Sequence, residues 1–139
     1  MANTTFNGPV TSQNGFITGH QVTAANAINA TATATAAQVA TGYITSTSAS
    51  ATAITLPTGT LLGAALNATQ GTSLDLYIDN TAGASAVTMV VAVNGILSTA
   101  AADSAASFGD LTVAAGATGL ARFTIMFSSA TAYAFTRTA

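Results

Sequence analysis

The chain has 139 residues, half of them hydrophobic, but only 4% are charged, and it contains no lysine, glutamate or cysteine. Its two arginines are too few for a nucleic-acid surface or for binding to anionic membranes, because both need several cations. The lack of cysteine excludes disulfides and thiolate metal sites. Polar residues interrupt every apolar stretch well before about 18 residues, so no transmembrane helix is predicted.

Much of the hydrophobic content is alanine, and only 6% of the residues are aromatic. Alanine buries little area, and burial contributes roughly 25 cal/mol per Å². A monomer built in this way has a thin core and little surface charge to keep copies apart. We therefore expect a permanently assembled protein that completes its burial against other chains; the alternative is a surface kept soluble by the hydroxyls and amides of threonine, serine and asparagine.

Residues 1–37 differ in composition from the rest. The turn pairs Gly8-Pro9 and Asn14-Gly15 argue against a continuous helix, and about the first 20 residues are interpreted as an extended arm. The run TAANAINATATATAAQ that follows is compatible with a strand or with disorder, and periodicity does not decide between them. No basic region followed by an apolar region marks a secretory signal. We predict an arm and low-complexity segment over 1–37 and a β domain over 38–139.

Alternating patterns predict β-strands from residue 38 onward. The pattern is clearest in SLDLYID, where leucine and isoleucine face one way and Asp75, Tyr77 and Asp79 face the other. Strands are also predicted in TGYITSTS, TAITLP, AVTMVVAVNG (with Val87, Met89, Val91 and Val93 on one face), LARFTIMF (with Phe123, Ile125 and Phe127 on one face) and AYAFTR (with Tyr133, Phe135 and Arg137 on one face).

Short turns separate these strands. The link Ser128–Ala130 predicts a hairpin of the last two strands. Short helical turns are expected in LLGAALN and AADSAASF. About seven short strands between glycine-rich turns predict an all-β fold, an antiparallel β-sandwich or jelly-roll-like domain with an extended N-terminal arm.

The residues give little support for catalysis. His20 is the only good general base at neutral pH, but it lies in the predicted arm, and no nucleophile motif accompanies it. Asp75 and Asp79 share a strand face roughly 13 Å apart, too far for a glycosidase carboxylate pair. The Asp79-Asn80 step lacks the loop of a calcium site. We expect these carboxylates to be surface charges or partners of Arg122 or Arg137, and we predict no enzyme, cofactor or metal.

Two sets of stretches carry a resemblance to known proteins. TTFNGPVTSQNGF resembles the opening of small virion structural proteins of tailed bacteriophages. The stretches ITLPTGTLLG, LDLYIDNTAGASAVTMVV and VAAGATGLARFTIMFSSATAYAFTR resemble the all-β domain of phage head decoration (cement) proteins. Together these stretches cover most of the chain.

The resemblance implies a homotrimer on the outer surface of a phage capsid, assembled in the host cytoplasm and bridging neighbouring capsomers. Its partner would be the major capsid protein of the same virus. The N-terminal arm would lie on the shell, and the residues expected to bind the capsid are Phe6, Pro9, Val10, Phe16 and Ile17. The alternative is a tail-fibre or spike module that binds a host receptor or glycan.

Overall fold

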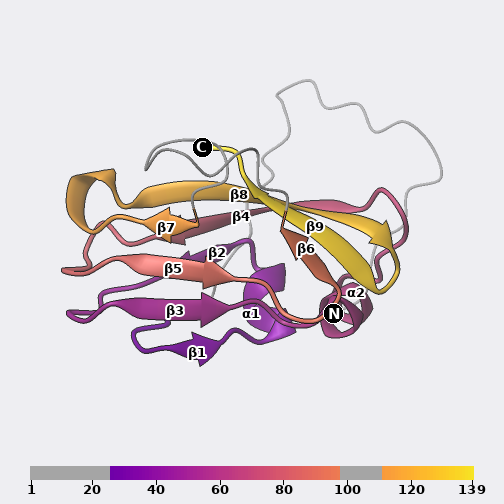
Figure 1. Ribbon diagram of the computed structural model, residues 1–139, viewed down its shortest axis with the longest axis horizontal. Coiled ribbons are helices and arrows are strands. Elements are labelled where there is room, and N and C mark those ends of the chain that lie inside the picture. The colour runs from indigo at the N-terminus through magenta and orange to yellow at the C-terminus, as the bar shows by residue number, and fades with distance from the viewer. Residues whose placement is uncertain (1–25, 98–110) are drawn as a thin grey trace, which may run out of the picture.

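The computed structural model describes residues 26–97 and 111–139 of the chain. They form two β-sheets that contribute to one hydrophobic core, together with two short helices (Figure 1). The elements in chain order are β1 (Ala32–Thr33), α1 (Ala36–Ala40), β2 (Tyr43–Thr45), β3 (Thr52–Thr55), α2 (Gly59–Leu66), β4 (Ser73–Asp79), β5 (Val87–Val90), β6 (Gly95–Leu97), β7 (Thr112–Val113), a 3₁₀ turn (Gly116–Thr118), β8 (Leu120–Ser129) and β9 (Ala132–Arg137).

Successive strands alternate between the two sheets from β1 to β8, and only β9 stays in the sheet of the strand before it. The four-stranded sheet has the order β1-β3-β5-β7, and the five-stranded sheet has the order β2-β4-β8-β9-β6. The strand that lies between in the other sheet lets the chain return in its earlier direction in three cases, whereas β7 returns antiparallel to β5. Accordingly β1, β3 and β5 pair in parallel (Figure 1), as do β2 and β4.

The β-rich prediction is confirmed, but the expected antiparallel arrangement is wrong for most strand pairs. Among the seven pairs of described strands, four are parallel and three are antiparallel, so both sheets are mixed. Alternation of apolar and polar residues reports which face of a strand is buried and not the direction of its neighbour. The predicted hairpin is confirmed, since β8 and β9 pair antiparallel across a short link.

The predicted facing of the long strands is also confirmed. Phe123 stacks on Phe135 with ring centroids 4.9 Å apart, and Phe127 meets Tyr133 at 5.9 Å, the offset and tilted geometries that aromatic pairs prefer. These aromatic side chains give the five-stranded sheet the bulkiest part of the core. The other fully buried large side chains are Ile44, Ile54, Leu56, Leu62, Leu76, Ile78, Met89 and Ile125.

One strand ends earlier than the pattern predicts. Val87 and Met89 are buried as expected, but β5 ends at Val90, and Val93 is 71% exposed rather than facing the core. The Gly95 amide donates to the carbonyl oxygen of Ala92 and turns the chain there, with Asn94 at a φ of 63°. The last residues of the predicted strand thus form a turn, in which the Val93 side chain is exposed to solvent.

The described part of the N-terminal segment packs with the β-strands that follow it. The predicted division after residue 37 falls inside α1, and residues 26–37 pack with the later strands. Ile28 and Ala34 are buried in the common core. A capping box starts α1: the Gln38 amide donates to the Thr35 hydroxyl, and the Thr35 amide donates to the Gln38 side-chain oxygen. The Thr/Ala run therefore contains both a strand and a helix.

Helix α2 is fixed by two glycines that the hairpin requires. A Cβ on Gly63 would lie 1.9 Å from the carbonyl oxygen of Ala130, and one on Gly59 would lie 2.2 Å from that of Thr131. Glycine costs about 1 kcal/mol relative to alanine inside a helix. Here it allows the backbone of α2 to pack directly against the β8–β9 turn, which leaves Leu62 buried and Leu61 exposed.

Asn80 joins the two sheets at the end of β4. Its side-chain nitrogen donates to the carbonyl oxygens of Ser85, Val113 and Ala114, at 2.9, 3.3 and 2.9 Å. The side chain is fully buried, and its oxygen has no hydrogen-bond partner. The Asn80 side chain therefore links the end of β4, in the five-stranded sheet, to β7 and to the loop before β5, in the four-stranded sheet.

Candidate functional site

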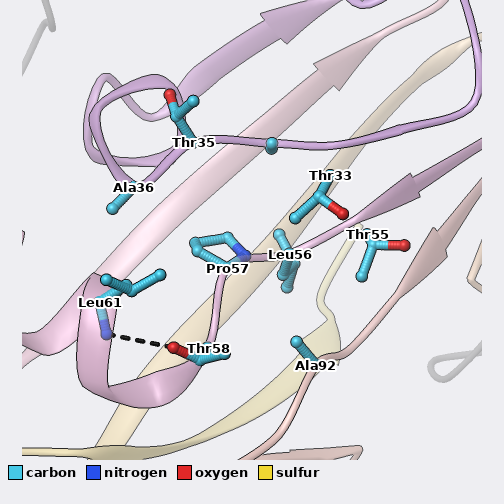
Figure 2. A pocket seen from close by; sticks show the side chains of 10 residues that line it. Thr33, Thr35, Ala36, Thr55, Leu56, Pro57, Thr58, Leu61 and Ala92 are labelled. Atoms are coloured by element: carbon cyan, nitrogen blue, oxygen red, sulfur yellow. Dashed lines mark hydrogen bonds between the residues drawn. The ribbon is translucent and has the colours of Figure 1, made fainter.

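A groove of about 520 Å³ lies where the carboxyl ends of β1 and β3 meet the starts of α1 and α2 (Figure 2). Parallel strands place their carboxyl ends at one edge of a sheet, and crevices at that edge are common binding sites. The residues that follow β1, β3 and β5 therefore converge there. The lining residues are Thr33, Ala34, Thr35, Ala36, Thr55, Leu56, Pro57, Thr58, Leu61 and Ala92.

The two helix caps shape the rim of the groove. Thr58 caps α2, because its hydroxyl accepts a hydrogen bond from the Leu61 amide at 3.3 Å (Figure 2). This cap holds the first turn of α2 and leaves the Leu61 side chain 60% exposed at the rim. Thr35 caps α1 in the same way and places Ala36 in the lining. The cap hydroxyls thus bond their own helices.

The floor of the groove is held by hydrogen bonds from both sheets. The Leu56 amide donates to the carbonyl oxygen of Val90 at 2.8 Å, which extends the pairing of β3 with β5. The hydroxyl of Tyr133, on β9, donates to the carbonyl oxygen of Pro57 at 3.0 Å. Burial raises the pKa of Tyr133 to about 12, so this hydroxyl stays protonated at neutral pH. The floor is therefore a fixed part of the fold.

None of the ten lining residues is ionisable. Four are threonines, and the other six are alanine, leucine or proline. Such a lining offers methyl groups and a few hydroxyls, but no general acid, base or metal-binding carboxylate. Its chemistry suits an uncharged, largely apolar chain segment.

The lack of charge extends from the groove over the four-stranded sheet as far as β7, where the Arg137 guanidinium of β9 donates to the Thr112 carbonyl oxygen at 3.0 Å. The four charged side chains of the described residues are Asp75, Asp79, Arg122 and Arg137, and all of them lie on strands of the five-stranded sheet. The outer face of the four-stranded sheet consists of Thr33, Ala53, Thr55, Thr88, Val90 and Thr112.

The two described carboxylates bond to hydroxyl groups instead of to the arginines. Asp75 accepts from the Thr124 hydroxyl at 2.8 Å, and Asp79 accepts from the hydroxyls of Tyr43 and Thr81. Hydrogen bonds from Thr81 and Tyr43 lower the pKa of Asp79, and the same bond to Asp79 raises the pKa of Tyr43. Of the two predicted roles, surface charge therefore describes these carboxylates, and an ion pair with Arg122 does not.

The predicted capsid-binding residues Phe6, Pro9, Val10, Phe16 and Ile17 lie outside the described residues, as do His20 and the expected helical turn AADSAASF. The sequence analysis did not identify the groove. Two signals for it were present, since Thr35-x-x-Gln38 matches a capping box and Thr58 directly precedes α2.

The described residues contain no cluster of three or more side chains of the types that bind metal ions. Within the same ranges, neither helix has the length and hydrophobicity needed to span a membrane. Comparison with protein-family models, curated proteins and solved structures gave no match to this chain.

Proposed function

We propose that this protein is a virion structural protein that decorates the outside of a phage capsid. In this proposal a homotrimer bridges neighbouring capsomers of the major capsid protein and resists their separation. No catalytic step, cofactor or metal is involved. Two surfaces would contact the shell: the N-terminal arm with the five residues Phe6, Pro9, Val10, Phe16 and Ile17, and the outer face of the four-stranded sheet.

The observation that carries the proposal is that the described four-stranded sheet, α1 and α2 contain no charged residue, although Arg137 of β9 contacts this sheet at the Thr112 carbonyl oxygen of β7. Exposed large hydrophobic side chains, Leu61, Val90 and Val93, occur in this half or its connections without a charged residue in the same elements. Sheets with parallel strands are usually covered on both faces, yet Thr88 and Val90 on the outer face are exposed. A surface of this kind supports docking onto another protein.

An uncharged contact also suits a lasting assembly. Exposed charge pairs are screened by salt over about 10 Å at 0.1 M, whereas apolar burial is not. Each arm adds two phenylalanines, and burying both would contribute about 3–6 kcal/mol. Three arms on one trimer would bind together, because the first contact raises the effective concentration of the others.

The tail-fibre or spike alternative predicts a recognition site for a receptor or glycan. Glycan sites commonly present aromatic rings to the sugar faces, and none of the ten groove residues is aromatic. The groove thus favours a chain segment over a sugar as its ligand, and decoration remains the better proposal.

Two measurements on purified virus particles test the proposal. Gel densitometry against the major capsid protein should give several copies per capsomer, whereas a fibre would give only a few per particle. Wild-type protein added to undecorated shells should bind, and a variant lacking residues 2–20 should bind much more weakly. A count of a few copies, or no binding by the wild type, would refute decoration. Full binding by the truncated variant would remove the arm from the contact.

A further inference from the structure

The groove is an apolar surface that opens to solvent in the described fold. Leu56 and Ala34 line the groove and are buried, and Leu61 is exposed at its rim near Ala36 (Figure 2). A side chain of leucine size that is 60% exposed beside a groove with no charged lining residue leaves apolar area in contact with water. An apolar segment that covered Leu61 would remove that contact.

We propose that, in the absence of a capsid, this groove holds the N-terminal segment of the same chain, residues 1–25. The docking itself is independent of the proposed function. Its consequence rests on that function: the shell and the groove would compete for one segment, so the arm would be covered until the protein meets a capsid.

Composition distinguishes this segment from the other part of the chain outside the described residues. Residues 98–110 contain Asp103 and Asp110, and placing carboxylates in an uncharged groove would cost their hydration. Residues 1–25 contain no aspartate, glutamate, lysine or arginine, and His20 is their one ionisable side chain. They also carry Phe6, Phe16 and Ile17, which provide the apolar area that the groove can bury.

The place where the segment joins the fold permits the docking. The side-chain nitrogen of Asn26 donates to the carbonyl oxygens of Gln38 and Tyr43, at 2.9 and 2.7 Å, which fixes Asn26 at the end of α1. Ala36, at the start of the same helix, lines the groove. A five-residue helix is about 7.5 Å long.

The reach of the segment is therefore ample. The ten residue steps from Phe16 to Asn26 span up to about 33 Å when extended. Because the segment is tethered to the same domain, its effective concentration at the groove is in the millimolar range. A weak contact of a few apolar side chains can then be well populated without a second copy.

Replacing Leu61 allows a selective test. Leu61 is the third residue of α2, three positions after the cap Thr58. A glutamate there completes the capping-box pattern that α1 already has with Thr35 and Gln38, and its charge suits a helix start. Leu61→Glu therefore places a charge at the groove rim without weakening the helix. Leu120→Glu is the matched control, because Leu120 is 55% exposed but lies on the five-stranded sheet.

Limited digestion with chymotrypsin, which cuts after phenylalanine, reads the docking of Phe6 and Phe16. Mass spectrometry of the full chain should show cleavage at these sites at least about 10-fold slower than in a synthetic peptide of residues 1–25, since cleavage follows the open population. Leu61→Glu should restore most of the peptide's rate, and Leu120→Glu should not. Thermal denaturation of both variants verifies that each is folded.

Cleavage of the wild type as fast as the peptide would overturn the proposal, as would equal effects of the two variants. Protection that increases with protein concentration would place the segment in the groove of another copy and would overturn the same-chain occupant. No shell is present in this experiment, so its failure leaves the decoration proposal standing, and a lack of capsid binding leaves the docking standing.

Discussion

The two sheets of this protein differ in almost every property except their shared core. The five-stranded sheet holds all four charged side chains of the described residues and the large aromatic core residues of β8 and β9. The four-stranded sheet has neither, and its outer face is threonine, alanine and valine. Under the proposed function this difference would be a division of roles, in which the five-stranded sheet supplies most of the stability and the four-stranded sheet with its groove supplies the contact surface.

The largest expected effect comes from the contact between α2 and the hairpin of the five-stranded sheet. Gly63→Ala would force a methyl group against the Ala130 carbonyl oxygen, because the space for it is only 1.9 Å. We expect a loss of more than about 3 kcal/mol in the free energy of unfolding, since neither backbone can give way without disturbing the packing. Urea denaturation measures it. Thr60→Ala, on the exposed side of the same helix, should change stability by less than about 0.5 kcal/mol.

A substitution of Asn80 measures how much its side-chain hydrogen bonds between the two sheets contribute to the free energy of unfolding. Asn80→Ala removes the hydrogen bonds that the Asn80 side chain donates to the carbonyl oxygens of Ser85, Val113 and Ala114. We expect a loss of about 2–3 kcal/mol, measured in the same denaturation experiment. A loss below about 1 kcal/mol would show that water or a neighbouring donor replaces the amide.

The buried Tyr133 of the five-stranded sheet should make the free energy of unfolding depend on pH in the alkaline range. Its pKa is about 12 in the folded protein against about 10 in the unfolded chain, so its stabilising contribution is complete below pH 10 and falls as the pH rises to 12. The free energy of unfolding should fall by about 2 kcal/mol over that range. Tyr133→Phe should be less stable at pH 7, because the Pro57 carbonyl oxygen loses its donor, but should lack most of this pH dependence.

The smallest expected effect is the change in stability at acid pH that follows from the protonation of Asp79. Its lowered pKa means that the contribution is present above the unfolded value near 4 and is lost as the pH falls through the lower folded value. Asp79→Asn should therefore have a lower melting temperature than the wild type at pH 7, and the two melting temperatures should be closer at pH 2. Asp75→Asn removes the same charge without touching the Tyr43 and Thr81 bonds. An equal pH-dependent difference in both variants would assign the effect to net charge alone.

Much of the five-stranded sheet could be predicted from the sequence. The alternation in β4, β8 and β9 identified which residues face the core, and the short link after Ser128 identified their hairpin. Long strands with large apolar side chains on one face have a pattern strong enough to read from a single sequence. Val93 was misplaced because a local turn ends β5 before the apolar run stops.

The four-stranded sheet was harder to predict, and the reasons are physical. The strand β1 has two residues, and threonine and alanine occur on surfaces, in strands and in short helices alike. Strand direction follows from the route of the chain between sheets, which no local pattern records. The groove arises where residues 33–36 and 55–58 meet, so its existence depends on the parallel pairing of β1 with β3.

A charge placed on each sheet in turn gives the most direct test of the account. Thr88 lies exposed on the outer face of the four-stranded sheet, and Ser73 lies exposed on the outer face of the five-stranded sheet. The affinity of Thr88→Glu and Ser73→Glu for undecorated shells of the parent virus would be measured against the wild type. We expect Thr88→Glu to bind at least about 10-fold more weakly, because the charge must be dehydrated in the contact, and Ser73→Glu to bind as the wild type does. Unchanged binding by Thr88→Glu, or a loss confined to Ser73→Glu, would contradict the assignment of the contact surface to the four-stranded sheet.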